Sequence, residues 1–187
     1  MSKKLTSLQE LYVHELKDIY SAEKQIARAL PKLAKAVNSD ELKTAIQEHL
    51  EQTEGQISRL EKIFKILGES SSGPKCKGME GLLAEGEDFT KEEAAEAVLD
   101  AGIIVGAQKV EHYEIAAYGS LCTFAEILGY DEDLQLLKET LAEEEETDQR
   151  LTQIAQGLNH EADSGNDSDD QEMEMASKSK KSSSRRF

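Results

Sequence analysis

Apolar residues recur at the spacing of an α-helix along almost all of the first 158 residues. From Leu5 to Val37, for example, an apolar side chain returns every three or four positions. Only two prolines interrupt the 187 residues, and residues that favour helices, such as Ala, Leu, Glu and Lys, are common. Such a chain is stable as long helices that bury one face against each other. The sequence therefore predicts an all-α fold.

Breaks in the pattern divide this region into long helices. The expected helices run from Leu5 to Val37, from Asp40 to Leu67, from Lys91 to the residue before Gly129, and from Asp131 to Leu158. Two of the breaks are so short that each must reverse the chain. Residues 69–91 are long enough to cross a bundle and to hold a short helix over Met79–Phe89. We therefore expect a ferritin-like antiparallel four-helix bundle, made of two helical hairpins joined by a crossover with that short helix.

Local signals mark the ends of two of these helices. Ser7 followed by Glu10 has the spacing of a capping box, which begins the first helix. Gly68 is placed to end the second helix in a left-handed conformation. After Leu158 the apolar pattern is lost, because an acidic run at 163–174 and a basic run at 178–186 are both interleaved with serine. We expect residues 1–158 to form the bundle and residues 159–187 to form a disordered charged tail.

The composition of the chain argues against several classes of function. A formal net charge of −16 argues against binding of DNA or RNA, both of which are polyanions. Two cysteines are too few for a disulfide framework. The start of the chain lacks the apolar segment of a signal peptide, and no apolar run has the length needed to span a membrane. The expected location is the cytoplasm.

Several polar residues fall on the apolar faces when each helix is projected at about 100° per residue. They are Glu23 on the first helix, His49 and Gln56 on the second, Glu111 and Glu114 on the third, and Glu144 and Asp148 on the fourth. Buried carboxylates are costly unless they are paired, protonated or bound to a cation. We therefore predict a metal site from these seven residues, whose oxygen atoms and single imidazole suit iron or manganese. The alternatives are that the acids pair with Lys17, Lys109, Arg150 or water, or that the helices rotate to expose them.

Five segments carry a resemblance to a known family. Residues 18–25, 49–56, 79–83, 108–119 and 137–144 read DIYSAEKQ, HLEQTEGQ, MEGLL, QKVEHYEIAAYG and LKETLAEE. Through these segments, residues 5–158 resemble the YciE/YciF family of bacterial stress-associated ferritin-like proteins. The resemblance implies a ferritin-like fold and a homodimer. The family is distantly similar to rubrerythrins, which bind two irons, and this similarity implies a di-iron centre.

The rubrerythrin ligand pattern is only partly present. That pattern has a Glu on the first helix, Glu-x-x-His on the second, Glu-x-x-Glu on the third and Glu-x-x-His on the fourth. Glu23, the pair Glu111 and Glu114, and Glu144 match it, but Thr147 stands in the place of the last His. On the second helix Glu51 begins the pattern yet projects outward. Both expected His ligands are therefore missing. We expect His49 to substitute for one of them, and Asp148 to serve as a ligand on the fourth helix.

The leading functional hypothesis is a stress-associated protein with a non-haem iron or manganese site, which oxidises ferrous iron or reduces oxygen or peroxide. One alternative is a metal-free homodimer that acts through contacts with other proteins. Another is an iron-storing or DNA-protecting shell, of which the net charge disfavours the DNA-protecting form. Tyr113 and Tyr118 lie near the predicted site, either as packing residues or as carriers of an electron.

Overall fold

The structure, a computed structural model, describes residues 4–183, with side chains as far as residue 164. This part of the chain contains five helices and no strand. The helices are α1 (Leu8–Ala36), α2 (Asp40–Leu67), α3 (Lys77–Phe89), α4 (Glu96–Leu128) and α5 (Asp131–Ser183). The predicted all-α fold class is confirmed. None of the described helices is both long enough and apolar enough to cross a membrane.

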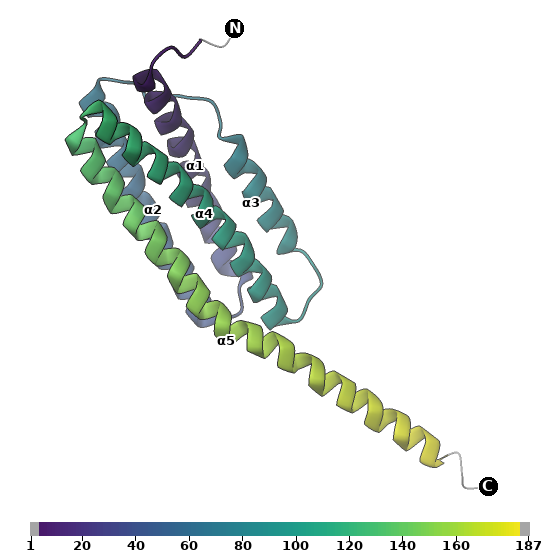
Figure 1. The fold of residues 1–187 in the computed structure, drawn as a ribbon. Helices are drawn as coiled ribbons and strands as arrows, with labels where there is room; N and C mark the ends of the chain where they lie inside the picture. Colours follow the sequence, from purple (N-terminus) through teal and green to yellow (C-terminus); the bar gives the residue numbers. More distant parts are fainter. Residues whose placement is uncertain (1–3, 184–187) are drawn as a thin grey trace.

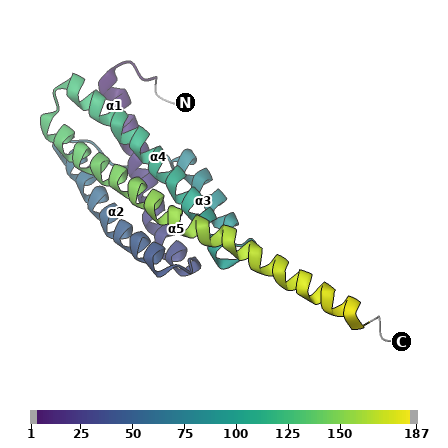
Figure 2. The same ribbon diagram turned by 60° about the horizontal axis from the view of Figure 1, so that its bottom comes forward.

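The four long helices close into a ring in the order α1, α2, α5, α4, in which each helix packs against the next (Figure 1). Neighbours in the ring run in opposite directions, because the turns at residues 37–39 and 129–130 reverse the chain. The view from below shows the same arrangement (Figure 2). The core lies inside the ring, where its largest fully buried side chains include Tyr12, Leu16, Ile19, Leu60, Tyr118 and Leu137.

The short helix α3 lies outside the ring, against α1 and α4 (Figure 1). Its last residue, Phe89, rests on the backbone of α4 at Gly102, where an added Cβ atom would overlap the ring. At the other end of α3, Gly78 leaves room for the ring of Tyr113 in the same way. Aromatic rings seated on glycine therefore hold α3 in place.

Most helix ends follow the local signals. The Ser7 hydroxyl accepts a hydrogen bond from the Glu10 backbone N–H at 3.1 Å, which confirms the predicted cap. Gly68 and Gly129 have φ values of +66° and +71° and end α2 and α4 in the left-handed conformation. The expected start of α4 near Lys91 is wrong, because residues 90–95 are used to reverse the chain between α3 and α4.

A buried carboxylate fixes the turn between α1 and α2. Asp100 of α4 accepts hydrogen bonds from the backbone N–H groups of Asn38 at 3.0 Å and Ser39 at 2.7 Å. Ser39 in turn caps α2, since its hydroxyl accepts from the N–H of Leu42. Asp100 therefore joins this turn to the first part of α4.

Helix α5 continues to Ser183, past the end of the bundle, whereas the sequence pattern predicted an end at Leu158 (Figures 1 and 2). Loss of the apolar pattern removes the packing partner of a helix but leaves its backbone hydrogen bonds intact. The division into a bundle at 1–158 and a disordered tail at 159–187 stays a prediction.

Candidate metal centre

Polar side chains from the long helices meet at one level inside the ring. His49 of α2, Glu111 and Glu114 of α4, and Glu144 of α5 offer potential ligand atoms that all lie within 4.8 Å of one another. Glu23 of α1 is fully buried and interacts with Glu114 and Glu144 of this group. We call these five residues the carboxylate cluster. None of them is more than 5% exposed.

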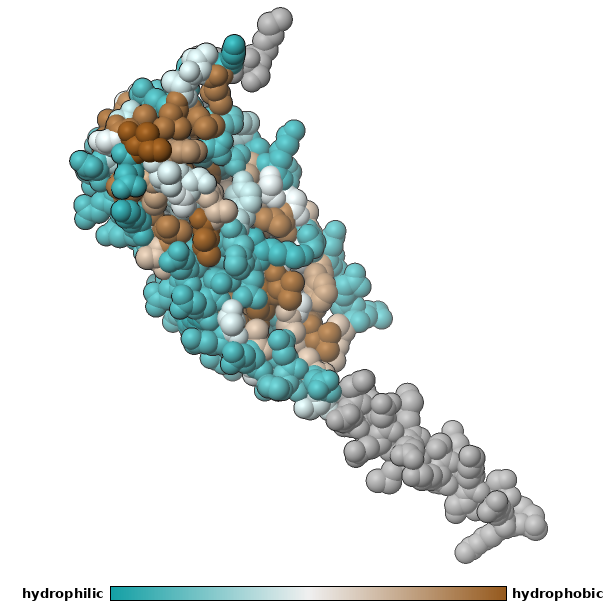
Figure 3. Space-filling model, in the orientation of Figure 1, coloured by the Kyte–Doolittle hydropathy of each residue, from teal (hydrophilic) through white to brown (hydrophobic). Residues whose placement is uncertain are grey.

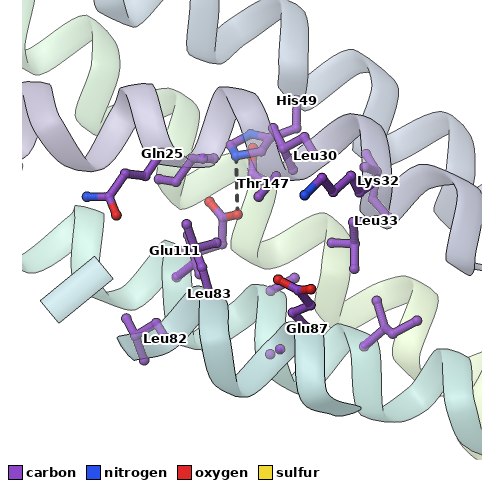
Figure 4. Close-up of a pocket in the computed structure, with 18 of the residues that line it drawn as sticks. Gln25, Leu30, Lys32, Leu33, His49, Leu82, Leu83, Glu87, Glu111 and Thr147 are labelled. Atoms are coloured by element: carbon purple, nitrogen blue, oxygen red, sulfur yellow. Dashed lines mark ion pairs between the residues drawn. The ribbon is translucent and has the colours of Figure 1, made fainter. Parts of the chain in front are cut away.

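Helix geometry explains why the cluster forms. Glu111 and Glu114 are three residues apart, so both lie on the same face of α4. The side chain of His49 crosses from α2 toward α4, and its Nε2 atom lies 3.5 Å from Oε1 of Glu111 (Figure 4). The sequence pattern therefore predicted the inward direction of these residues correctly.

Neighbouring side chains satisfy a few of the carboxylate oxygens. The hydroxyl of Tyr118 donates to Glu23, and the amide of Gln56 donates to Glu144. Arg59 donates to Glu143, the neighbour of Glu144, with 2.7 Å between Nη1 and Oε2. Neither Arg59 nor Glu143 belongs to the cluster, but the charge of Arg59 partly opposes the rise that burial causes in the pKa of Glu144.

Many buried polar atoms of the cluster still have no hydrogen-bond partner. Among the described residues they are Oε2 of Glu23, both ring nitrogens of His49, Oε2 of Glu111, both carboxylate oxygens of Glu114, and Oε2 of Glu144. Oε1 of the adjacent Gln56 also has no partner. Buried polar groups in native proteins are nearly always paired. Such a concentration of unpaired acceptors fits a site that takes up cations.

The side chains that were proposed to neutralise these acids bind elsewhere. Lys17 lies 3.8 Å from Glu69, while Lys109 pairs with Glu85 and Arg150 pairs with Glu48. The alternative in which these cations pair with the interior acids is therefore wrong. The alternative in which the helices rotate to expose the acids is also wrong for Glu23, Glu111, Glu114 and Glu144, which are buried.

Burial controls the charge of the cluster. Burial and the charge of Glu144 together raise the pKa of Glu23 to about 8, and burial raises the pKa of Glu144 to about 7. Burial and the neighbouring carboxylates also raise the pKa of Glu111 and Glu114 well above the ordinary value. Burial lowers the pKa of His49 to about 4, so its imidazole is neutral near pH 7. Without a metal, the cluster retains protons at neutral pH.

One predicted ligand lies apart from the others. Asp148 is partly exposed and accepts a hydrogen bond from Gln108 at 3.1 Å, and His112 lies 3.5 Å away. Asp148 comes four residues after Glu144, which turns it about 40° further round the helix. The structure therefore does not bring Asp148 together with the cluster. Gln56 is buried beside the cluster as a hydrogen-bond donor.

The structure also places Glu51, Thr147 and His49, the positions at which this chain departs from the rubrerythrin ligand pattern. Glu51 is exposed, so the outward projection of this residue was correct. Thr147 donates its hydroxyl to the backbone oxygen of Glu143 and does not replace an imidazole. His49 is consequently the imidazole that α2 contributes to the cluster.

Sequence reasoning placed Tyr118 near the predicted site but did not predict its hydrogen bond to Glu23, and it did not identify Arg59. Tyr118 follows Glu114 by four residues on the same stripe, so its inward direction was visible, but its bond to Glu23 on another helix was not. Tyr113, in contrast, is satisfied by a 2.8 Å hydrogen bond to Asp18 outside the cluster.

Comparison with known proteins identifies the family. Residues 7–163 match the family described as "Domain of unknown function (DUF892)". The chain belongs to this family. It is 46% identical over 156 residues to Protein YciF of Escherichia coli strain K12, an alignment that covers 81% of this chain and 92% of that protein. The predicted resemblance to the YciE/YciF family is confirmed.

Solved structures of DUF892 relatives and more distant proteins share the fold. The crystal structure of the E. coli stress protein YciF aligns with a TM-score of 0.81 and 44% identity, over 83% of this chain and 99% of that one. A dodecameric thioferritin from Bacteroides fragilis aligns with a TM-score of 0.65 and 17% identity, over 84% of this chain and 91% of that one. At this identity the second likeness concerns the fold alone.

Proposed function

We propose that the carboxylate cluster binds iron or manganese in a ferritin-like bundle, and that the protein acts in a stress response through this metal. The observation that supports the proposal most is the set of buried, unpaired acceptor atoms on His49, Glu111, Glu114 and Glu144. A bound cation would compensate these groups at once, whereas the lysines and arginines of the described part of the chain form their ion pairs with other acids.

The donor set fits the proposed metals. Four carboxylates and one neutral imidazole are hard to borderline ligands, which suit iron and manganese. Many ferritin-like two-metal sites use four carboxylates and two imidazoles, and the rubrerythrin pattern has one carboxylate more, so this chain has one imidazole fewer than either. We propose a di-iron centre on Glu23, His49, Glu111, Glu114 and Glu144, with the metal count as the quantity to be measured.

Iron, when bound, supplies a change between the ferrous and ferric states, which suits oxidation of ferrous iron or reduction of oxygen or peroxide. The chain's own residues hold and orient the ligands. Tyr118 and Gln56 each fix one carboxylate by a hydrogen bond, and Arg59 fixes the neighbouring Glu143. Burial of the cluster keeps bulk water away from the reacting centre.

Metal content per chain, measured by elemental mass spectrometry after aerobic reconstitution with ferrous iron, tests the proposal. We expect near-stoichiometric or higher iron in the wild type and at least a tenfold loss in Glu111→Gln. The matched control is Glu145→Gln, which changes an exposed acid beside Glu144 and should keep the metal. A folded wild-type protein that takes up neither iron nor manganese would refute the metal proposal.

One observation favours a second candidate, a metal-free stress protein that acts through protein contacts. The bonds from Tyr118 to Glu23 and from Gln56 to Glu144 already stabilise two of the acids without a metal. The same metal measurement separates the two candidates, since the second requires an empty wild-type protein.

We propose further that the chain forms a homodimer. Leu5, Ile66 and Ile127 are exposed at the end of the bundle where α2 and α4 end, and apolar atoms gather at this end in Figure 3. Exposed apolar patches commonly mark contacts between proteins. Size-exclusion chromatography should give a dimer that Ile127→Glu weakens, whereas a much larger particle would favour a ferritin-type shell.

A further inference from the structure

A cavity of about 510 Å³ lies beside the carboxylate cluster, within the range of about 300–1,000 Å³ that small-molecule sites occupy. All five helices contribute residues to its wall. Much of this wall is apolar and includes Ile26, Leu30, Ile46, Leu83 and Val110. Metal ions alone would not need such a wall, because they bind through oxygen and nitrogen atoms.

The carboxylate cluster forms part of the cavity wall. His49 and Glu111 both line the cavity, and Figure 4 shows these two side chains facing each other, with Leu83 of α3 nearby. Both ring nitrogens of His49 and Oε2 of Glu111 lack a hydrogen-bond partner, although the two residues are only 5% and 2% exposed. A molecule in the cavity can therefore place a polar end beside the proposed metal ligands.

The charged side chains of the cavity cancel one another. Its lining holds four basic residues, which are Arg28, Lys32, Lys75 and Arg150. It also holds four acidic residues, which are Glu80, Glu87, Glu111 and Glu146. All of these except Glu111 are at least partly exposed, so water solvates them. The lining therefore has no excess of either charge that would select a charged body for the ligand.

The size of the cavity separates the reactants that the proposed function leaves open, which are ferrous iron, oxygen and peroxide. Oxygen and hydrogen peroxide are close in size to water, which takes about 30 Å³ in the liquid, so they need far less space than this cavity offers. An organic hydroperoxide, R–O–OH, combines a small polar end with a larger apolar group R. The apolar wall suits R, and the unpaired polar atoms suit the peroxide end.

We propose that an uncharged organic hydroperoxide, in which R is an alkyl or aryl group, is the substrate of this site; this inference rests on the proposed function. R lies along the apolar wall, and the peroxide end lies at His49 and Glu111. Reduction breaks the O–O bond. Two ferrous ions supply two electrons and become ferric, and two protons complete one molecule of the alcohol R–OH and one of water.

Binding to the metal-free, full-length protein tests the cavity without turnover. Cumyl alcohol, which reduction of cumene hydroperoxide releases, should bind a saturable site and shift the amide NMR signals of lining residues such as Leu83. The same alcohol with a carboxylate on its ring should bind at least about tenfold more weakly, because burial of an unpaired charge is costly. Ala107→Phe, which fills the cavity, should abolish binding. Ala116→Phe, at an exposed position of the same helix outside the cavity, should not.

Anaerobic single-turnover oxidation of the iron-loaded protein tests the substrate class. The iron content of each ferrous sample is measured first. At equal concentrations, cumene hydroperoxide should oxidise the bound iron of the wild type faster than hydrogen peroxide does. Ala107→Phe should lower the ratio of these two rates at least about tenfold, because the added ring occupies the space that R needs. Ala116→Phe should leave the ratio unchanged.

The inference is overturned if metal-free wild type shows no saturable binding of cumyl alcohol, or if the carboxylated alcohol binds as well. A loaded wild type that hydrogen peroxide oxidises faster than cumene hydroperoxide overturns this inference alone and leaves the proposed metal site standing. A wild type that holds no metal overturns both. If Ala107→Phe does not fold, the comparison of the two alcohols and that of the two peroxides in the wild type still decide.

Discussion

Glu23 shows how an acidic side chain is kept in the core of this protein. It is fully buried, accepts a hydrogen bond from Tyr118, and has a pKa raised to about 8 by burial and by the charge of Glu144. In the metal-free protein it is therefore a neutral acid over most of the physiological pH range. Stability of that form should depend on pH through this residue.

We expect the metal-free protein to lose stability as the pH rises. The folded pKa of Glu23 lies above its ordinary value of 4.5, so the folded state binds more protons than the unfolded state between pH 4.5 and about 8. The stability that the protonated Glu23 contributes to the folded state is fully present below pH 4.5 and is lost as the pH rises through 8. In the presence of a chelator, Glu23→Gln should melt at least about 5 °C above the wild type at pH 8.5. Equal pH dependence in both proteins would contradict this expectation.

His49 should change stability with pH in the opposite direction to Glu23. Burial lowers its pKa from 6.5 to about 4, so the unfolded state binds the extra proton, and stability is lost as the pH falls through this interval. Thermal denaturation of His49→Gln between pH 4 and 6.5 should show a flatter dependence on pH than the wild type. A parallel pair of curves would mean that His49 is not buried in its neutral form.

At the level of elements, the turn between α1 and α2 depends on a residue from α4. Removal of the Asp100 carboxylate in Asp100→Ala would leave the N–H groups of Asn38 and Ser39 without their acceptor. We expect a loss of about 1–3 kcal/mol in the free energy of unfolding, measured by urea denaturation. Glu92→Ala, a change at an exposed acid in the connection before α4, is the control and should cost less than about 0.5 kcal/mol.

The part of α5 beyond the bundle should contribute little to stability. Its backbone extends past the ends of the other helices (Figure 1). A chain that ends at Leu158 should melt within about 3 °C of the full-length protein in differential scanning calorimetry. A larger loss would show that the bundle requires residues after 158, and the predicted domain boundary would then be wrong.

Sequence reasoning succeeded for elements that carry local signals. The bounds of α2 follow from its caps at Ser39 and Gly68, and the inward acids follow from helical periodicity, which needs no tertiary information. The start of α4 was not predictable in this way, because Ala95 gives no side-chain capping bond. The pairing of Arg59 with Glu143 on another helix depends on long side chains whose directions no periodicity describes.

For the whole molecule, metal binding and folding should be linked. A ligand that binds the folded state at 100 times its dissociation constant adds about 2.7 kcal/mol to stability. We therefore expect ferrous or manganous ions to raise the melting temperature by about 5–10 °C. A chelator should reverse the rise, and Glu111→Gln should show none. A melting temperature that is unchanged by metal in the wild type would count against a site inside the bundle.

The contact between Phe89 and Gly102 attaches α3 to the bundle without involving the residues of the carboxylate cluster. The four long helices carry every residue of the carboxylate cluster, while α3 is joined to them by an aromatic ring that rests on bare main chain. A single methyl group at Gly102 would act as a wedge beneath that ring and lift α3, with no change to any ligand. A substitution at Gly102 should therefore change access to the interior of the bundle from a position that is remote from the carboxylate cluster.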